Sequence, residues 1–152
     1  MTNWIEKELN QQTQQSNERQ LLANLSREFW VSAAAAIQSD AEEINANYLP
    51  QFDTPPITIN PESSSLSGLG DILIISSDII PSYRIELAFD SEQKTISVKT
   101  ESRKKFGETK RSSRRKLDFS LDKEKHIVLR EGGESVTLEE LSQSVLIPLV
   151  KR

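Results

Sequence analysis

The sequence YRIELAF at residues 83–89 alternates large apolar side chains with small or charged ones and has no break. Its odd-numbered residues are aromatic or aliphatic, and its even-numbered residues are Arg84, Glu86 and Ala88. Successive side chains of a strand point to opposite faces, so this pattern predicts a β-strand with one face in a core and the other in water. We therefore expect an antiparallel sheet that is covered on one face.

The neighbouring strand is predicted at residues 95–101 (TISVKTE), where apolar and polar side chains alternate again. The length of the connecting loop decides which charged residues of the two strands stand opposite each other. A two-residue loop opposes Arg84 to Lys99, whereas a four-residue loop opposes Glu86 to Lys99 and Arg84 to Glu101. Because directly opposed like charges are destabilising, we predict the four-residue loop.

One helix is predicted before the strand region of the chain and one after it. Residues 3–49 contain no glycine or proline, which favours one long helix, and Thr137 with Glu140 forms a capping box that starts a short C-terminal helix. We expect this last helix to end near Ile147, because Pro148 lacks a backbone donor. Further strands are expected at 71–76, 117–121 and 126–130. The whole predicts an α+β two-layer sandwich: a long N-terminal helix, an antiparallel meander of about five strands and a short C-terminal helix.

The predicted long helix has a polar interruption at residues 10–17 (NQQTQQSN). This tract is either a polar extension of the helix or a hinge, with Asn17 as a new N-cap. We assign residues 1–16 to a peripheral segment and residues 17–152 to a single domain. Trp4 lies in the peripheral segment, and we expect it to dock on the domain; the alternative is a partner-binding segment.

Residues 30–37 (WVSAAAAI) are apolar in nearly every direction around the helix. A buried core helix explains this composition, and a homodimer interface through Trp30–Ile37 is the alternative.

Composition excludes several chemistries. The 152 residues include no cysteine and one histidine, so cysteine nucleophiles, thiolate metal sites and two-histidine metal motifs are absent from the sequence. His126 lies opposite Asp122 in the expected hairpin, but no nucleophile accompanies the pair. No apolar run is long enough to cross a bilayer. We expect a cytoplasmic protein that is not an enzyme and requires no metal or cofactor.

One segment carries most of the positive charge. Residues 103–116 (RKKFGETKRSSRRK) hold eight of the 19 lysines and arginines with one acid, a charge of about +7, so the remainder carries about −11. We predict that this segment is the long loop of a hairpin, 103–116, because dense like charges repel when they are packed together.

The predicted partner-binding residues are all in this loop: Arg103, Lys104, Lys105, Phe106, Lys110, Arg111, Arg114, Arg115 and Lys116. An acidic protein is the partner that we expect for a non-enzymatic adaptor or binding protein. Contact with nucleic acid or an anionic lipid through the same hairpin is an alternative, opposed by the acidic remainder of the chain. A solvated loop without a partner is a further alternative, as is a small enzyme or ligand carrier with a pocket between helix and sheet.

Overall fold

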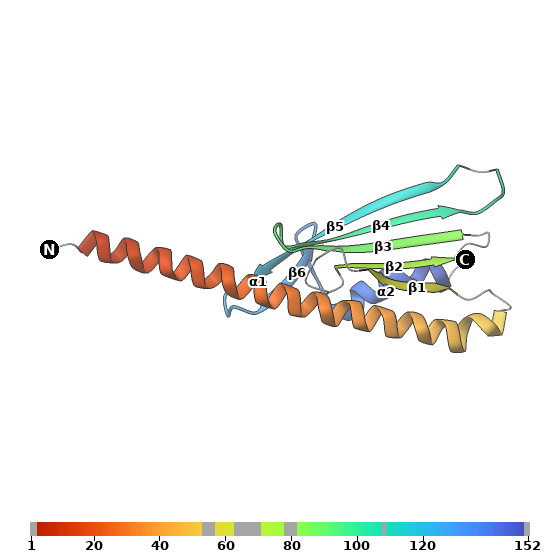
Figure 1. Ribbon diagram of the computed structural model, residues 1–152, viewed down its shortest axis with the longest axis horizontal. Helices are drawn as coiled ribbons and strands as arrows, with labels where there is room; N and C mark the ends of the chain where they lie inside the picture. The colour runs from red at the N-terminus through yellow and green to blue at the C-terminus, as the bar shows by residue number, and fades with distance from the viewer. Residues whose placement is uncertain (1–2, 53–56, 63–70, 78–81, 108, 151–152) are drawn as a thin grey trace.

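The protein is an α+β fold in which helices cover one face of an antiparallel sheet (Figure 1). The computed structural model describes residues 3–52, 57–62, 71–77, 82–107 and 109–150. Helix α1 (Asn3–Glu43) runs along the sheet and is followed by short helical turns η1 (Ile44–Tyr48) and η2 (Leu49–Phe52). Helix α2 (Leu138–Val150) packs beside α1, and the hydroxyl of Ser142 donates a 2.6 Å hydrogen bond to Asp40 of α1. The predicted fold class is confirmed.

The sheet is a meander of seven strands, each antiparallel to the next in the chain. The sequence pattern predicted about five strands. The strands are β1 (Thr58–Glu62), β2 (Ile72–Ser77), β3 (Ser82–Asp90), β4 (Thr95–Arg103), β5 (Arg111–Leu121), β6 (Ile127–Glu131) and β7 (Glu134–Val136). Both additional strands, β1 and β7, are short. Strand β7 follows β6 after a turn in which Gly132 and Gly133 have φ values of 60° and 89°, a conformation that glycine adopts without strain.

The register between β3 and β4 is the one that the charges predicted. Glu86 stands opposite Lys99 and Arg84 opposite Glu101, and residues 91–94 form the turn. The buried face of β3 lies under α1, where the Phe89 ring stacks on Trp30 at 5.9 Å between centroids. The ring of Phe89 also meets Phe119 of β5 edge-on at 6.0 Å. These aromatic contacts connect the helix layer to the centre of the sheet.

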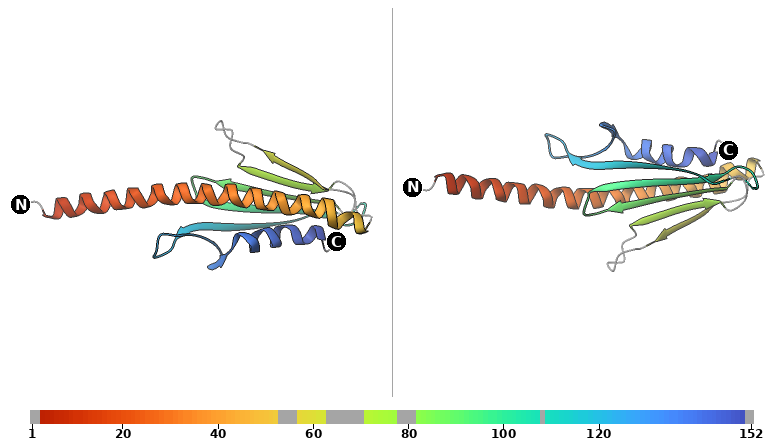
Figure 2. Two further views of the ribbon diagram at one scale, coloured as in Figure 1. Left: turned by 90° about the horizontal axis from the view of Figure 1, so that it is seen from below. Right: turned by 90° about the horizontal axis from the view of Figure 1, so that it is seen from above.

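Helix α1 is continuous, so residues 10–17 are a polar extension of the helix, and the alternative of a hinge with Asn17 as N-cap is wrong. The polar side chains of residues 10–17 do not interrupt the helix, because glutamine is a good helix former and no glycine or proline intervenes. Residues 3–17 are exposed and extend beyond the sheet (Figures 1 and 2). Trp4 is 73% exposed, so the expected docking of this residue on the domain is also wrong.

The expected core of α1 is present. Trp30, Ala33 and Ile37 are each at most 1% exposed, because the chain's own sheet and α2 cover them. The exposed apolar residues of this stretch are Val31 and Ala35. Burial within one chain thus accounts for the apolar composition of residues 30–37 without a second subunit.

Helix α2 starts at the predicted capping box and ends later than predicted. The backbone N–H of Glu140 donates to Thr137 Oγ1 at 3.1 Å, and the Thr137 N–H donates to Glu140 Oε1 at 3.4 Å. The helix continues through Pro148 to Val150, so its expected end near Ile147 is wrong. In the last turn proline removes a single helical hydrogen bond, and Leu149, 1% exposed, still packs in the core.

Candidate protein-docking surface on strand β5

The basic segment is a strand for much of its length. Arg103 is the last residue of β4, and Arg111 is the first of β5, so the connection is residues 104–110 and not 103–116 as predicted. Arg111, Arg114, Arg115 and Lys116 therefore have fixed places in the sheet. Like charges are tolerated here because consecutive side chains point to opposite faces of the sheet and two serines separate Arg111 from Arg114.

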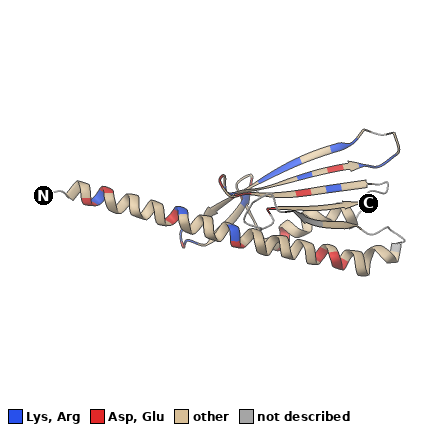
Figure 3. Cartoon of the chain, in the orientation of Figure 1, with Lys and Arg blue, Asp and Glu red and all other residues tan. Residues whose placement is uncertain are grey.

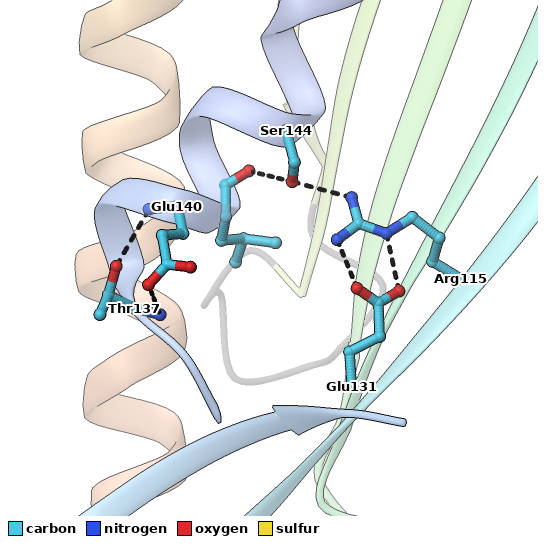
Figure 4. Close-up of polar contacts among 6 residues, drawn as sticks. Arg115, Glu131, Thr137, Glu140 and Ser144 are labelled. Carbon is cyan, nitrogen blue, oxygen red and sulfur yellow. Dashed lines mark hydrogen bonds and ion pairs between the residues drawn. The ribbon is translucent and has the colours of Figure 1, made fainter. Parts of the chain in front are cut away.

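Arg115 points to the helix-covered face, where its guanidinium donates hydrogen bonds to other residues of the chain (Figure 4). Its Nε and Nη2 donate to the two carboxylate oxygens of Glu131, at the end of β6, both at 2.8 Å. Its Nη1 donates to Ser144 Oγ of α2 at 2.8 Å, and this hydroxyl donates to the carbonyl oxygen of Leu141. The Arg115 guanidinium lowers the pKa of Glu131, mainly through these hydrogen bonds, and Glu131 raises the pKa of Arg115. Arg115 thus joins β5, β6 and α2.

Arg114 and Lys116 point to the open face of the sheet and are exposed. In the register of the sheet Arg114 stands opposite Lys99, and Lys99 stands opposite Glu86. Lys99 forms an ion pair with Glu101 at 3.2 Å. The hydrogen bond that Lys99 donates is the main cause that lowers the pKa of the Glu101 carboxyl. Among the described residues, no carboxylate lies within ion-pair distance of Arg114 or Lys116. Their charges are available to a partner.

The outer edge of β5 is open along the same residues. Strand β4 pairs with β5 along Arg111–Asp118. Strand β6, on the other side, pairs with β5 only from Asp118 to Leu121. Within the described chain, no strand covers the other edge of β5 from Arg111 to Leu117, and β5 is the uppermost strand in Figure 1. An open edge presents backbone donors and acceptors that an added strand can use.

The hairpin tip adds exposed groups beside this edge. Phe106 is 91% exposed, and Gly107 takes a positive φ of 77° in the connection. Lys104, Lys105 and Lys110 are exposed in the connection, and Arg103 is half-buried at the end of β4. Figure 3 shows the cations as blue segments along β5, whereas β3 and β4 carry red segments as well as blue ones.

Acidic residues lie close to these cations on the open face. A shallow hollow of about 550 Å³ is lined by Glu86 and Asp90 together with Lys99, Arg114 and Lys116. The surface is therefore mixed in charge across β3 and β4 and basic along β5. The sequence placed Glu86 and Lys99 outward but did not predict the open edge. The sequence did contain a signal for the open edge. The basic segment and the strand after it are together much longer than the next predicted strand, residues 126–130, so that strand is too short to pair with all of them.

His126 lies away from this surface, in the turn between β5 and β6. It is exposed, with Nδ1 3.8 Å from Asp122 Oδ2 and 3.6 Å from Glu124 Oε2. The backbone N–H of His126 donates to Asp122 Oδ1 at 2.8 Å, which closes the turn. This geometry gives the Asp122–His126 pair a structural role in the hairpin.

The fold and the surface together define an α+β meander protein with a cationic, open strand edge. No protein-family model, curated protein or solved structure matches this chain. In the parts of the chain that the structure describes, no helix is both long and apolar enough to cross a membrane.

Proposed function

We propose that the protein is a non-enzymatic adaptor or binding protein whose β4–β5 hairpin docks on an acidic protein partner. The observation that carries the proposal is the coincidence of the open β5 edge, Arg111–Leu117, with two cations that no described carboxylate neutralises, Arg114 and Lys116. The edge supplies backbone hydrogen bonds and the cations supply selectivity for charge.

The mode of binding that fits this geometry is strand addition. An extended segment of the partner pairs with β5 as an additional strand, and its side chains alternate between the two faces of the sheet. Carboxylates at alternate positions of that segment meet Arg114 and Lys116 on the open face. Arg115 takes no part, because its guanidinium is held by Glu131 and Ser144.

Charge distribution favours a protein over a nucleic acid as the partner. Glu86, Asp90 and Glu101 lie among the cations of the open face, and they repel a continuous phosphate backbone. The chain outside residues 103–116 carries about −11, which opposes the close approach of a long polyanion. Separate carboxylates on an extended protein segment can match the cations and avoid the acids.

A capture experiment tests the proposal. Tagged protein is incubated with nuclease-treated native lysate, and the wild type is compared with Arg114→Glu/Lys116→Glu. Lys123→Glu/Lys125→Glu is the matched control, because it makes the same change of charge at exposed residues in the β5–β6 turn. The proposal expects the wild type and the control to retain a protein that the β5 variant loses. Equal capture by the three proteins contradicts it, and so does a partner that is captured only from a parallel sample of lysate without nuclease.

A further inference from the structure

The N-terminal part of α1 is a helix without a cover. Residues 3–17 are exposed, although Trp4, Ile5 and Leu9 are large apolar residues with exposed fractions of 73%, 38% and 58%. Trp4 and Leu22 are eighteen residues apart, which is about five helical turns, so they lie on the same side of α1. Leu22 packs against the core below the sheet. The extension therefore presents apolar residues on the side that the sheet covers further along the helix.

This side of the extension has a regular seam. Its residues recur at alternating intervals of three and four, the spacing of two helices that pack along their length. The seam consists of Ile5, Glu8, Gln12, Gln15, Arg19 and Leu22. Its outer positions are aliphatic, its inner positions are amides, and the positions between carry one acid and one base.

The seam of one helix is complementary to the seam of a second, antiparallel copy of the same helix. Two antiparallel copies place Ile5 against Leu22, Glu8 against Arg19 and Gln12 against Gln15, and the two-fold axis repeats each pair. A parallel arrangement instead opposes Glu8 to Glu8 and Arg19 to Arg19, which costs free energy in both layers. We propose that the occupant of this helix face is a second copy of the chain, paired antiparallel through residues 4–22 as a two-fold symmetric dimer.

The structure also has a place for Trp4 of the second copy. Where α1 leaves the sheet, a hollow of about 340 Å³ opens between the helix and β5. Its lining includes Arg19, Leu22, Phe119 and Leu121. In the antiparallel arrangement Trp4 of one copy comes next to Ile5, which faces Leu22 of the other, so the indole reaches this hollow. The Arg19 guanidinium can then lie over the ring.

This dimer leaves the proposed docking surface free. The β4–β5 hairpin lies at the opposite end of the molecule from the extension (Figure 1). The dimer therefore presents two β5 edges, and a partner with two acidic segments gains affinity by binding both. Failure of the dimer does not affect the docking proposal, because the two surfaces share no residue.

Charge exchange across the seam tests the pairing. The dissociation constant of the dimer is measured by sedimentation equilibrium of the full chain for the wild type, Glu8→Arg, Arg19→Glu and the double variant Glu8→Arg/Arg19→Glu. Each single variant places like charges in two layers and is expected to raise the constant about tenfold or more. The double variant restores opposite charges in an antiparallel pair and is expected to return the constant to within about threefold of the wild type.

Val31→Glu, on the exposed side of the same helix, is expected to dimerise as the wild type does, and circular dichroism checks that all variants keep their helix content. A wild type that stays monomeric up to the highest soluble concentration overturns the proposal. So do single variants that dimerise normally, and so does a double variant that stays dissociated.

Discussion

Arg115 and Glu131 are joined by two 2.8 Å hydrogen bonds at the point where β6 separates from β5. Beyond this pair the sheet continues with β5 as its outer strand, and the edge from Arg111 to Leu117 is open. The ion pair thus holds β6 and α2 in place beside the open edge. It separates the cation that stabilises the fold, Arg115, from those available to a partner, Arg114 and Lys116.

Removal of Arg115 is expected to destabilise the protein. Arg115→Ala removes a bidentate, partly buried ion pair and the hydrogen bond to Ser144, and we expect the free energy of unfolding to fall by about 1–2 kcal/mol. Arg114→Ala, on the exposed face of the same strand, should change it by less than about 0.5 kcal/mol. Denaturant unfolding measures both; equal losses would show that the pair contributes nothing specific.

The Arg115–Glu131 pair also predicts a dependence of stability on pH. The pKa of Glu131 lies below its ordinary value of 4.5 in the folded protein, because the Arg115 guanidinium donates hydrogen bonds to the ionised carboxylate. Its contribution to stability is therefore complete above pH 4.5 and is lost as the pH falls through the lower, native pKa. The difference in unfolding free energy between the wild type and Glu131→Gln should be constant near neutral pH and shrink in acid. A difference that grows in acid would contradict the lowered pKa.

The capping box at the start of α2 predicts a second loss of stability. Thr137→Ala removes the hydroxyl that accepts the backbone hydrogen bond of Glu140, and we expect a cost of about 1 kcal/mol. Ser135→Ala, at an exposed position of β7, serves as the control and should be nearly neutral. Thermal and denaturant unfolding of the two variants make the comparison, and similar values would argue against the cap.

The register of β3 and β4 predicts a repulsion that salt should relieve. Glu86→Lys places a third cation in the row that contains Lys99 and Arg114, and we expect a loss of about 0.5–1 kcal/mol at low ionic strength. Because salt screens exposed charges, the loss should decrease as the salt concentration rises. Glu92→Lys, in the β3–β4 turn, is the control. Losses that are equal or independent of salt would contradict the proposed electrostatic origin.

The central part of the fold could be predicted because local patterns and the tertiary structure agree there. The alternation at 83–89 required a half-buried strand, and the charges of Glu86 and Lys99 selected the correct register. Strand β7 could not be predicted in the same way, because a three-residue strand has too few residues to show a period.

The candidate site was predicted in composition but not in form. Dense like charge is typical of a solvated loop, yet hydrogen bonds between backbones pair Arg111–Asp118 with β4 whatever the side chains are. The role of Arg115 depends on Glu131 and Ser144, which the fold brings together from β6 and α2. The spacing of these three residues in the sequence does not predict that contact. Trp4 was expected to dock because an exposed indole is costly, and the continuous helix carries it away from the domain.

The most direct test of the docking proposal is amide hydrogen exchange of the protein, free and bound to the partner that the wild type captures from nuclease-treated lysate. Strand addition predicts new protection along Arg111–Leu117, with little change in β3, whose two edges are already paired. Protection that appears elsewhere, while the amides of Arg111–Leu117 exchange as in the free protein, would contradict the claim that the open β5 edge is the docking surface.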